Sequence, residues 1–311
     1  MDGIVGIAVI GNCEVVSTTS ADCLFQAGSL SKTVTAALAL ELVERGELDL
    51  DSDVRGTTLR DLLGHTAGAN VPFYPGYPQG DPVPTLAQSL EGVEPAATPA
   101  VTVDSKIAGR FRYSGGGYAM VQQLIEDVTG EPFAETAHRV IFEPLGMAQS
   151  SFAQPPEFLG ASAAWADRRF YPEQAAAGLW TTPPDLARFV CALLTRQTVE
   201  QMTEPRAKLP FRGQWTVLAL LGLRFPRHAG LGLFVHEHRF INLGGAAGSF
   251  SALTGSRADG SGAVVMTAGC RSPRAVRLLL ELGDARGWTD LRAFRRGIRR
   301  RPSDLLLRAL S

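Results

Sequence analysis

Ser29 and Lys32 are three residues apart, at the start of a segment from Ser29 to Arg45 whose apolar residues have helical spacing. One turn of helix brings positions i and i+3 to the same face, so the lysine amine can reach the serine hydroxyl. A lysine that is neutral at this position can accept the hydroxyl proton and make the serine a nucleophile. The spacing therefore predicts a serine nucleophile with a lysine as its general base.

The surroundings of the pair favour this chemistry. A short strand-like run, Leu24 to Ala27, and then Gly28 precede the serine. Ser29 is thus expected at a helix N-terminus, where backbone N–H groups stabilise negative charge on an attacked carbonyl. Lowering a lysine pKa from about 10.4 to about 7 requires roughly 4 to 5 kcal/mol, which burial and the helix dipole can supply together. A capping serine beside a half-exposed lysine is the alternative interpretation.

The patterns around this helix predict strands at both ends of the chain and helices in the middle. At the N-terminal end, runs from Ile4 to Ile10 and from Cys13 to Thr18 flank Gly11-Asn12, a two-residue turn typical of a β-hairpin. The last third has strand-like runs and then a helix, at Trp215 to Leu223, Gly230 to His236, Ser249 to Thr254, Ala263 to Thr267 and, for the helix, Pro273 to Leu282. The middle has helix caps at Thr58 and Thr85 and helices from about Gly117 to Thr129 and after Pro183-Pro184.

These elements predict an α/β (α+β) fold, with an antiparallel sheet flanked by helices, an inserted all-helical lobe and a cleft between the two lobes. Residues 1–56 and 212–290 are expected to form a discontinuous α/β lobe, and residues 57–211 the helical lobe. Residues 291–311 form a basic C-terminal tail. Its arginines can dock an acidic partner, although a solvated terminal segment is the simpler interpretation.

Composition excludes several classes of function. The chain has 311 residues, 45% of them hydrophobic, with a formal net charge of -1, so it has no broad positive field for nucleic acid. No apolar run reaches the roughly 18 residues of a membrane span, and the first residues lack the positive charge of a signal peptide. The four cysteines show no metal-binding spacing. We therefore expect a cytoplasmic protein without a metal or other cofactor.

Several further segments of the chain have the form of sequence motifs. In chain order they are Leu62-Leu63-Gly64-His65-Thr66-Ala67-Gly68, Tyr113-Ser114-Gly115-Gly116-Gly117-Tyr118, Pro144-Leu145-Gly146-Met147, Ala177-Gly178-Leu179-Trp180-Thr181-Thr182-Pro183 and Gly244-Gly245-Ala246-Ala247-Gly248. Together with the segment around Ser29 they extend over nearly the whole chain, and any one alone is a weak signal. In this order they resemble the motifs of the class C β-lactamase, penicillin-binding-protein-like and esterase family.

The resemblance implies catalytic roles beyond the serine and the lysine. Tyr113 stands at the family's second motif, Tyr-x-Asn, where a cationic neighbour favours its phenolate form and allows it to shuttle a proton to the leaving group. The third motif aligns with Asn242-Leu243-Gly244 and leads into the second oxyanion donor. The implied oxyanion hole consists of the N–H groups of Ser29 and Gly245.

The chain departs from the family pattern at two positions that contact substrate. Gly115 replaces the amide of the second motif, and Asn242 replaces the lysine or histidine of the third. A site without these side chains loses its preference for β-lactam or peptide groups. We expect substrate contacts from Asn242, Gly244 and Gly115, and from the aromatic residues Trp180 and Tyr74 in the cleft wall; His65 is expected to be structural.

The sequence therefore predicts a serine acyl-enzyme hydrolase for an ester, thioester or amide of a small molecule, with Ser29, Lys32 and Tyr113 as catalytic residues. Two alternatives remain open. An amine or alcohol acceptor in place of water would make the protein a transacylase of secondary metabolism. The changes at Gly115 and Asn242 are also compatible with a non-catalytic binding relative.

Overall fold

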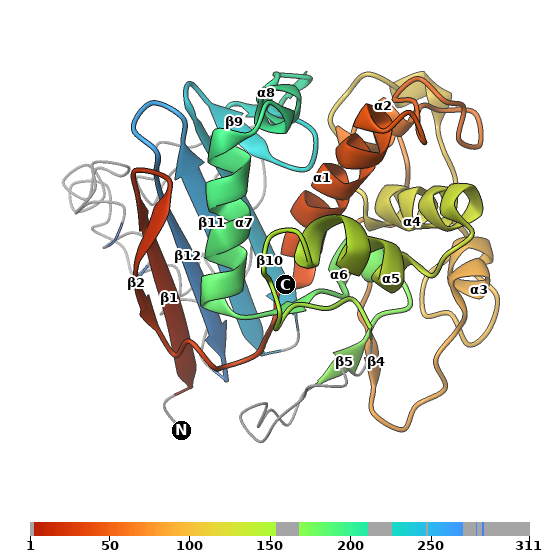
Figure 1. The fold of residues 1–311 in the computed structure, drawn as a ribbon. Coiled ribbons are helices and arrows are strands. Elements are labelled where there is room, and N and C mark those ends of the chain that lie inside the picture. Colours follow the sequence, from red (N-terminus) through yellow and green to blue (C-terminus); the bar gives the residue numbers. More distant parts are fainter. Residues whose placement is uncertain are drawn as a thin grey trace, which may run out of the picture.

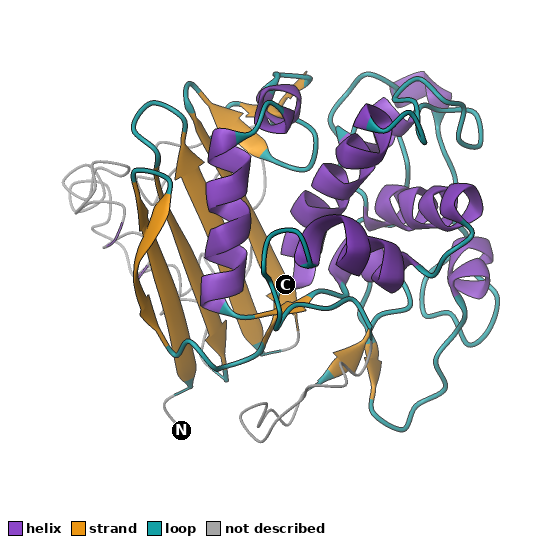
Figure 2. Ribbon diagram, viewed as in Figure 1, coloured by secondary structure: helices purple, strands orange, loops and turns teal. Residues whose placement is uncertain are grey.

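The structure is a computed structural model of the 311-residue chain. It describes residues 3–153, 168–210, 226–246 and 248–269, together with Leu278 and Leu282. Two groups of elements lie side by side, a large sheet with one long helix across it and a cluster of helices next to it (Figure 1). Figure 2 shows this division by element type.

The main sheet has eight described strands in the order β2-β1-β12-β11-β10-β9-β8-β7. All its described strand pairs are antiparallel. β1 pairs with β12 from Ile4↔Ala268 to Ile10↔Gly262, so the two ends of the described chain share one sheet. The strands are β1 (Ile4–Gly11), β2 (Glu14–Thr19), β7 (Ala207–Lys208), β8 (His228–Ala229), β9 (Phe234–His236), β10 (Arg239–Ala246), β11 (Ser249–Ser256) and β12 (Ser261–Ala268).

The helix α7 packs across β2, β1, β12 and β11 on one face of the sheet (Figure 1). Thr182 caps it, accepting a hydrogen bond from the Asp185 N–H, and Pro183 occupies its first turn. The helical elements are η1 (Gly28–Leu30), α1 (Ser31–Glu44), α2 (Leu59–Leu63), α3 (Leu86–Glu91), η2 (Ser105–Ile107), α4 (Gly115–Thr129), α5 (Phe133–Ala137), η3 (His138–Phe142), α6 (Gln174–Ala177), α7 (Pro183–Thr195) and α8 (Thr198–Thr203).

The antiparallel sheet flanked by helices confirms the predicted fold class. The segment expected to be wholly helical also contains short strands, which its Gly- and Pro-rich sequence did not reveal. β4 (Tyr77–Pro78) pairs with β5 (Arg169–Phe170), and β7 joins the edge of the main sheet. β6 (Trp180–Thr181) pairs with β3 (Phe25–Gln26).

Several predicted boundaries shift by one or two residues. The hairpin turn lies at Asn12 and Cys13, both with positive φ, instead of at Gly11-Asn12. The helix α4 begins at Gly115, two residues before its predicted start, because the Ser114 side chain caps it by accepting from the Gly117 N–H. The caps at Thr58 and Thr85 are confirmed.

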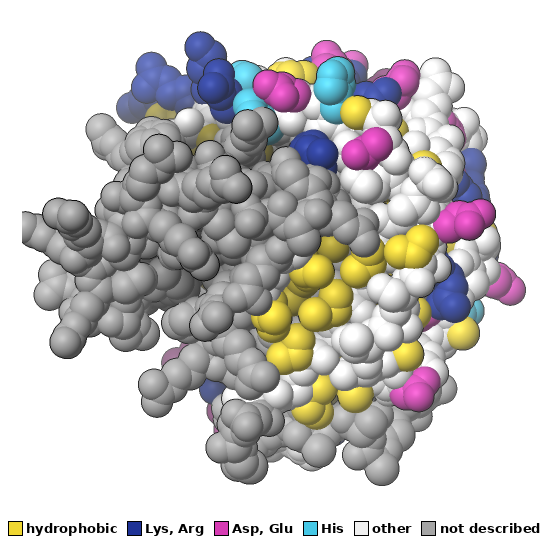
Figure 3. Space-filling model, turned by 90° about the vertical axis from the view of Figure 1, so that its left-hand side faces the viewer, with side chains coloured by type: hydrophobic (Ala, Val, Ile, Leu, Met, Phe, Trp, Pro, Cys, Tyr) yellow, Lys and Arg dark blue, Asp and Glu magenta, His cyan; other side chains and the backbone are white. Residues whose placement is uncertain are grey.

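The face of the sheet opposite α7 carries its own apolar cluster. Ala252 and Val265 are buried there, with Ile241, Leu243 and Phe250 packed around them and Leu278 and Leu282 over them. Figure 3 views the molecule from the left-hand side of Figure 1, and hydrophobic side chains gather on that side. Leu278 and Leu282 are both helical, in the predicted helix Pro273 to Leu282, whose other residues lie outside the described ones. The predicted strand Trp215 to Leu223 and the basic tail also lie outside the described residues.

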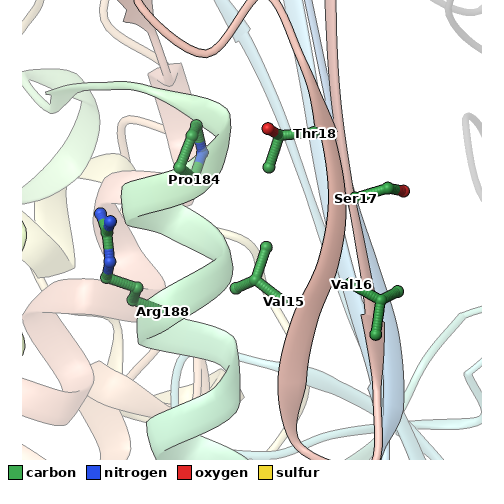
Figure 4. Close-up of a pocket in the computed structure, with 6 residues that line it drawn as sticks. All are labelled: Val15, Val16, Ser17, Thr18, Pro184 and Arg188. Carbon is green, nitrogen blue, oxygen red and sulfur yellow. The ribbon is translucent and has the colours of Figure 1, made fainter.

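A surface hollow lies between β2 and α7 (Figure 4), with a volume of about 430 Å³. Its lining residues are Val15, Val16, Ser17, Thr18, Pro184 and Arg188. It contains none of the side chains predicted to be catalytic.

Candidate active site

Ser29 lies in η1, one turn of 3-10 helix immediately before α1, instead of in the first turn of the α-helix itself. The turn is held from within, because the Ser31 hydroxyl donates to the Gly28 carbonyl over 2.6 Å. Ser31 also accepts a hydrogen bond from the Leu179 N–H, 3.0 Å away, which ties the turn to the segment after α6. Ser29 remains partly exposed, whereas Gly28 and Leu30 are buried.

Lys32 is buried, with 3% of its surface exposed. Its Nζ lies 3.4 Å from Ser29 Oγ and donates to the Ala176 carbonyl over 2.7 Å. Burial lowers the pKa of Lys32 from 10.5 to about 7, because desolvation disfavours the charged amine. The amine is therefore neutral in a substantial fraction of molecules near pH 7 and can accept the serine proton.

Tyr113 lies beside this pair. Nζ of Lys32 is 5.0 Å from the centre of the tyrosine ring. Burial raises the pKa of Tyr113, and a hydrogen bond with the Ser29 side chain opposes this rise only in part. The expectation of a phenolate stabilised by a cation is therefore wrong: desolvation dominates, and Tyr113 is a neutral phenol that can donate or relay a proton.

His65 holds the backbone on both sides of Tyr113 in place. Its Nδ1 accepts from the Ser114 N–H over 3.2 Å, and its carbonyl accepts from the Arg112 N–H over 2.8 Å. Its ring centre is 4.5 Å from that of Tyr113. Burial, and to a smaller extent the charge of Lys32, lowers the pKa of His65 to about 3, so the ring is neutral at physiological pH. The expectation of a structural histidine satisfied by backbone is confirmed.

Gly245 lies at an edge of β10 that none of the described strands covers. β9 pairs with β10 only from Arg239 to Ile241, so η1 faces the remainder of that edge. A Cβ built on Gly28 would lie 2.5 Å from the Gly245 carbonyl oxygen, so this carbonyl points toward η1, the turn that contains Ser29. In an extended strand a residue's N–H and C=O point to the same edge. The Gly245 N–H is therefore directed to the Ser29 side of β10, as an oxyanion donor requires.

Gly28 makes this close approach possible. Its φ of +54° belongs to the left-handed region, which glycine adopts without strain. A side chain at this position would also collide with the Gly245 carbonyl. The spacing between η1 and β10 therefore depends on a residue without a Cβ at position 28.

The carbonyl that binds Lys32 is itself held in place, by a residue that sequence reasoning missed. Gln122, buried on α4, donates from Nε2 to the Pro172 carbonyl and accepts at Oε1 from the Ala175 N–H, each over 3.1 Å. These two bonds fix both ends of the segment that leads to Ala176. A polar residue one helical turn after Tyr118, among the apolar residues of α4, was the available signal.

Asn242 lies on β10 as aligned, but its side chain is 4% exposed. Nδ2 donates to Thr33 Oγ1 over 2.6 Å and to the Gly232 carbonyl over 3.2 Å, and Oδ1 accepts from the Leu243 N–H over 2.8 Å. The expected contact between this amide and substrate needs correction, since its polar groups are already used. Asn242 joins β10 to α1.

The other residues expected to bind substrate are also mostly buried. Trp180 is 3% exposed in β6 and Tyr74 is 8% exposed, so neither presents its ring to solvent. Gly244 packs against η1, where a Cβ would meet Ala27 and the Ser29 N–H. Gly115 lies against Tyr74 and Pro72. The aromatic side chain that is exposed beside Tyr113 is Phe73, which the sequence analysis did not single out.

Within the described part of the chain, no three His, Cys, Asp or Glu side chains come together as metal ligands would. None of the helices described is both long and apolar enough to cross a bilayer.

Residues 3–283 match the family described as Beta-lactamase. The chain belongs to this family. The match extends over both groups of elements and includes Ser29, Lys32, Tyr113 and Gly245, so the predicted resemblance is confirmed.

Among curated relatives, the chain is similar to penicillin-binding protein 4 of Amycolatopsis lactamdurans, with 31% identity over 144 residues, 42% of this chain and 36% of the relative. It is also similar to a teichoic acid D-alanine hydrolase of Staphylococcus aureus, with 25% identity over 43% of this chain and 34% of the relative. The alignments span about a third of the length of these relatives.

Among solved structures, the D-amino acid amidase from Ochrobactrum anthropi SV3, complexed with L-phenylalanine, superposes with a TM-score of 0.68. The identity is 20%, and the match covers 86% of this chain and 85% of the amidase. This similarity establishes the shared fold.

Proposed function

We propose that the protein is a serine acyl-enzyme hydrolase, with Ser29 as nucleophile, Lys32 as general base and Tyr113 as proton relay. The observation that carries the proposal is the buried amine of Lys32, 3.4 Å from Ser29 Oγ, with its pKa lowered to about 7. A lysine held in this way has a high desolvation cost that an ordinary structural role does not require.

In the proposed mechanism, Ser29 Oγ attacks the carbonyl carbon and its proton passes to Nζ of Lys32. The carbonyl electron pair moves onto oxygen, and the N–H groups of Ser29 and Gly245 stabilise the negative charge. Collapse of this intermediate breaks the bond to the leaving group, which receives the proton through the Tyr113 hydroxyl. Water then attacks the acyl-serine ester, giving its proton to Lys32, and the serine is regenerated.

We propose that the acyl donor is an ester, thioester or amide of a small molecule and not a β-lactam. The Asn242 amide is used inside the protein, and Gly115 has no side chain to pair with a substrate amide. A site without partners for these groups gains nothing from binding them. The names of the similar D-alanine hydrolase and D-amino acid amidase favour a donor with an amino-acid acyl group.

The proposal is tested by intact-mass spectrometry after incubation with a fluorophosphonate or an activated ester. We expect a single adduct on the native protein and none on Ser29→Ala. Lys32→Ala and Tyr113→Phe should each slow adduct formation by about 10² to 10⁴. Absence of an adduct on the native protein, or an adduct that persists in Ser29→Ala, would favour the non-catalytic alternative.

A further inference from the structure

Phe73 presents an aromatic ring to solvent next to the catalytic tyrosine. The residue is 59% exposed. Its ring centre lies 5.4 Å from that of Tyr113, with the planes inclined by 35°. An exposed aromatic face beside the reacting groups is a surface on which an apolar part of a ligand can be buried.

The loop that carries Phe73 is fixed to the second motif. The Gly116 N–H donates to the Val71 carbonyl over 2.9 Å, and the Gly115 N–H donates to the Pro72 carbonyl over 3.0 Å. These bonds use N–H groups at the start of α4, which have no partner within the helix. The backbone on the N-terminal side of Phe73 is therefore placed by the same helix that follows Tyr113, and less ordering is needed when a ligand binds.

The next residue, Tyr74, fills the space that an amide side chain at position 115 would need. A Cβ built on Gly115 would lie 3.2 and 3.3 Å from two carbons of the Tyr74 ring, which is shorter than ordinary van der Waals contact. The Tyr74 hydroxyl is buried, and burial raises its pKa, so it stays neutral. The polar element of the second motif is thus replaced by an aromatic ring.

Tyr113 also belongs to an apolar cluster. Phe111, Leu209 and Ile241 are partly buried and pack with Tyr113 around Ala229 and Phe234. Apolar side chains besides Phe73 therefore surround the tyrosine.

We propose that Phe73 is a specificity-determining residue and that the acyl group of the substrate is aromatic or a large apolar group, packed on the Phe73 ring. This inference rests on the proposed acyl-enzyme function. Stacking such a group against Phe73 buries apolar surface on both partners, and the preferred aromatic geometry adds to the gain. A short acyl group leaves the ring exposed.

The test compares trifluoroethyl 3-phenylpropanoate with trifluoroethyl propanoate, two esters with the same non-aromatic leaving group. We expect the native protein to prefer the phenyl ester in kcat/KM, and Phe73→Ala to reduce this preference roughly three- to tenfold. The decrease in kcat/KM should affect the phenyl ester, mainly through a higher KM. Phe73→Leu keeps apolar bulk without the ring and should lose part of the preference.

Val16→Ala is the matched control, because Val16 has nearly the same exposure, 58%, on the edge strand β2. It should leave the preference unchanged. Equal kcat/KM for the two esters on the native protein, or an unchanged preference in Phe73→Ala, overturns the inference. Adduct formation with a fluorophosphonate, measured on the same samples, keeps the two proposals apart: an adduct without ester preference refutes only the role of Phe73, and no adduct refutes both.

Discussion

The Ala176 carbonyl oxygen lies 2.7 Å from Nζ of Lys32, on the amine that also approaches the nucleophile. This carbonyl accepts a hydrogen bond from the amine, so the lone pair of neutral Lys32 is left for the serine proton. The neutral form is available because burial has lowered the pKa of Lys32 to about 7. The geometry and the protonation state of the base thus depend on the same buried position.

The first prediction concerns pH. Acylation requires neutral Lys32, so its rate should rise with pH and level off above an apparent pKa near 7. Single-turnover adduct formation with an activated ester, measured between pH 5.5 and 9, gives this profile. A rate that is still rising at pH 9, without levelling off, would show that the amine titrates as an exposed lysine.

The same shift has a consequence for stability. The pKa of Lys32 is lower in the folded than in the unfolded state, so between about 7 and 10.5 the unfolded chain binds more protons. The free energy of unfolding should therefore rise with pH in this window, by on the order of a few kcal/mol for this group. Lys32→Met should remove this contribution, which denaturant unfolding at pH 7 and pH 9 can measure.

A third prediction assigns Gln122 a positioning role. Gln122→Ala leaves the Pro172 carbonyl and the Ala175 N–H without their partner, and it should destabilise the fold by about 1 to 3 kcal/mol. Looser packing around Ala176 should also hydrate Lys32 and move the acylation profile to higher pH. Gln123→Ala, which removes only a surface bond to Asp127, is the control. A stability loss without a shift of the profile would indicate a purely structural residue.

The chemistry of this site was easier to predict from sequence than its substrate contacts. The spacing of Ser29 and Lys32 and the strand, glycine and helix around them follow local rules of chain geometry. The sheet was also predicted in outline, because β1 and β12 contain apolar runs. The two-residue strands β4 to β8 carry no such pattern and were missed. The strand β10 was not among the predicted runs either and was placed only by the resemblance of its glycines to the third motif.

Burial of single side chains depends on which segments meet in the fold, and local sequence does not record this. Trp180 and Tyr74 lie among glycines and prolines, a context typical of cleft walls, yet both are buried. Phe73 adjoins Tyr74 in the same loop, yet Phe73 is exposed whereas Tyr74 is buried. The phenolate form of Tyr113 was inferred from a nearby cation, but the larger effect of desolvation could not be seen without the structure.

A fourth prediction separates a structural from a substrate-binding role for Asn242. Asn242→Ala removes the bonds to Thr33 and Gly232 and should cost about 1 to 3 kcal/mol in unfolding free energy. In a double-mutant cycle with Thr33→Val, the two changes should show a clear coupling energy. KM for an activated ester should change little. A rise in KM with unchanged stability would restore the substrate-binding interpretation.

The last prediction tests whether Tyr74 occupies the place of the missing amide. Gly115→Asn brings its side chain against the Tyr74 ring and should destabilise the fold by about 1 to 3 kcal/mol through overpacking. Tyr74→Ala opens a cavity and is also destabilising. In the double variant the asparagine can enter that cavity, so the combined loss should be smaller than the sum of the two single losses.

Thermal and denaturant unfolding of the four proteins give the coupling. Gly117→Ala is the control, because its Cβ would make only ordinary contacts, the nearest at 3.4 Å from Leu62, and Tyr74 is not among its three nearest neighbours. Its effect on the unfolding free energy should add to that of Tyr74→Ala without a coupling energy. Strict additivity for Gly115→Asn and Tyr74→Ala would mean that the two positions do not share one space. Coupling, with new acylation of the double variant by a peptide-like amide donor, would show that the aromatic ring is what excludes such donors.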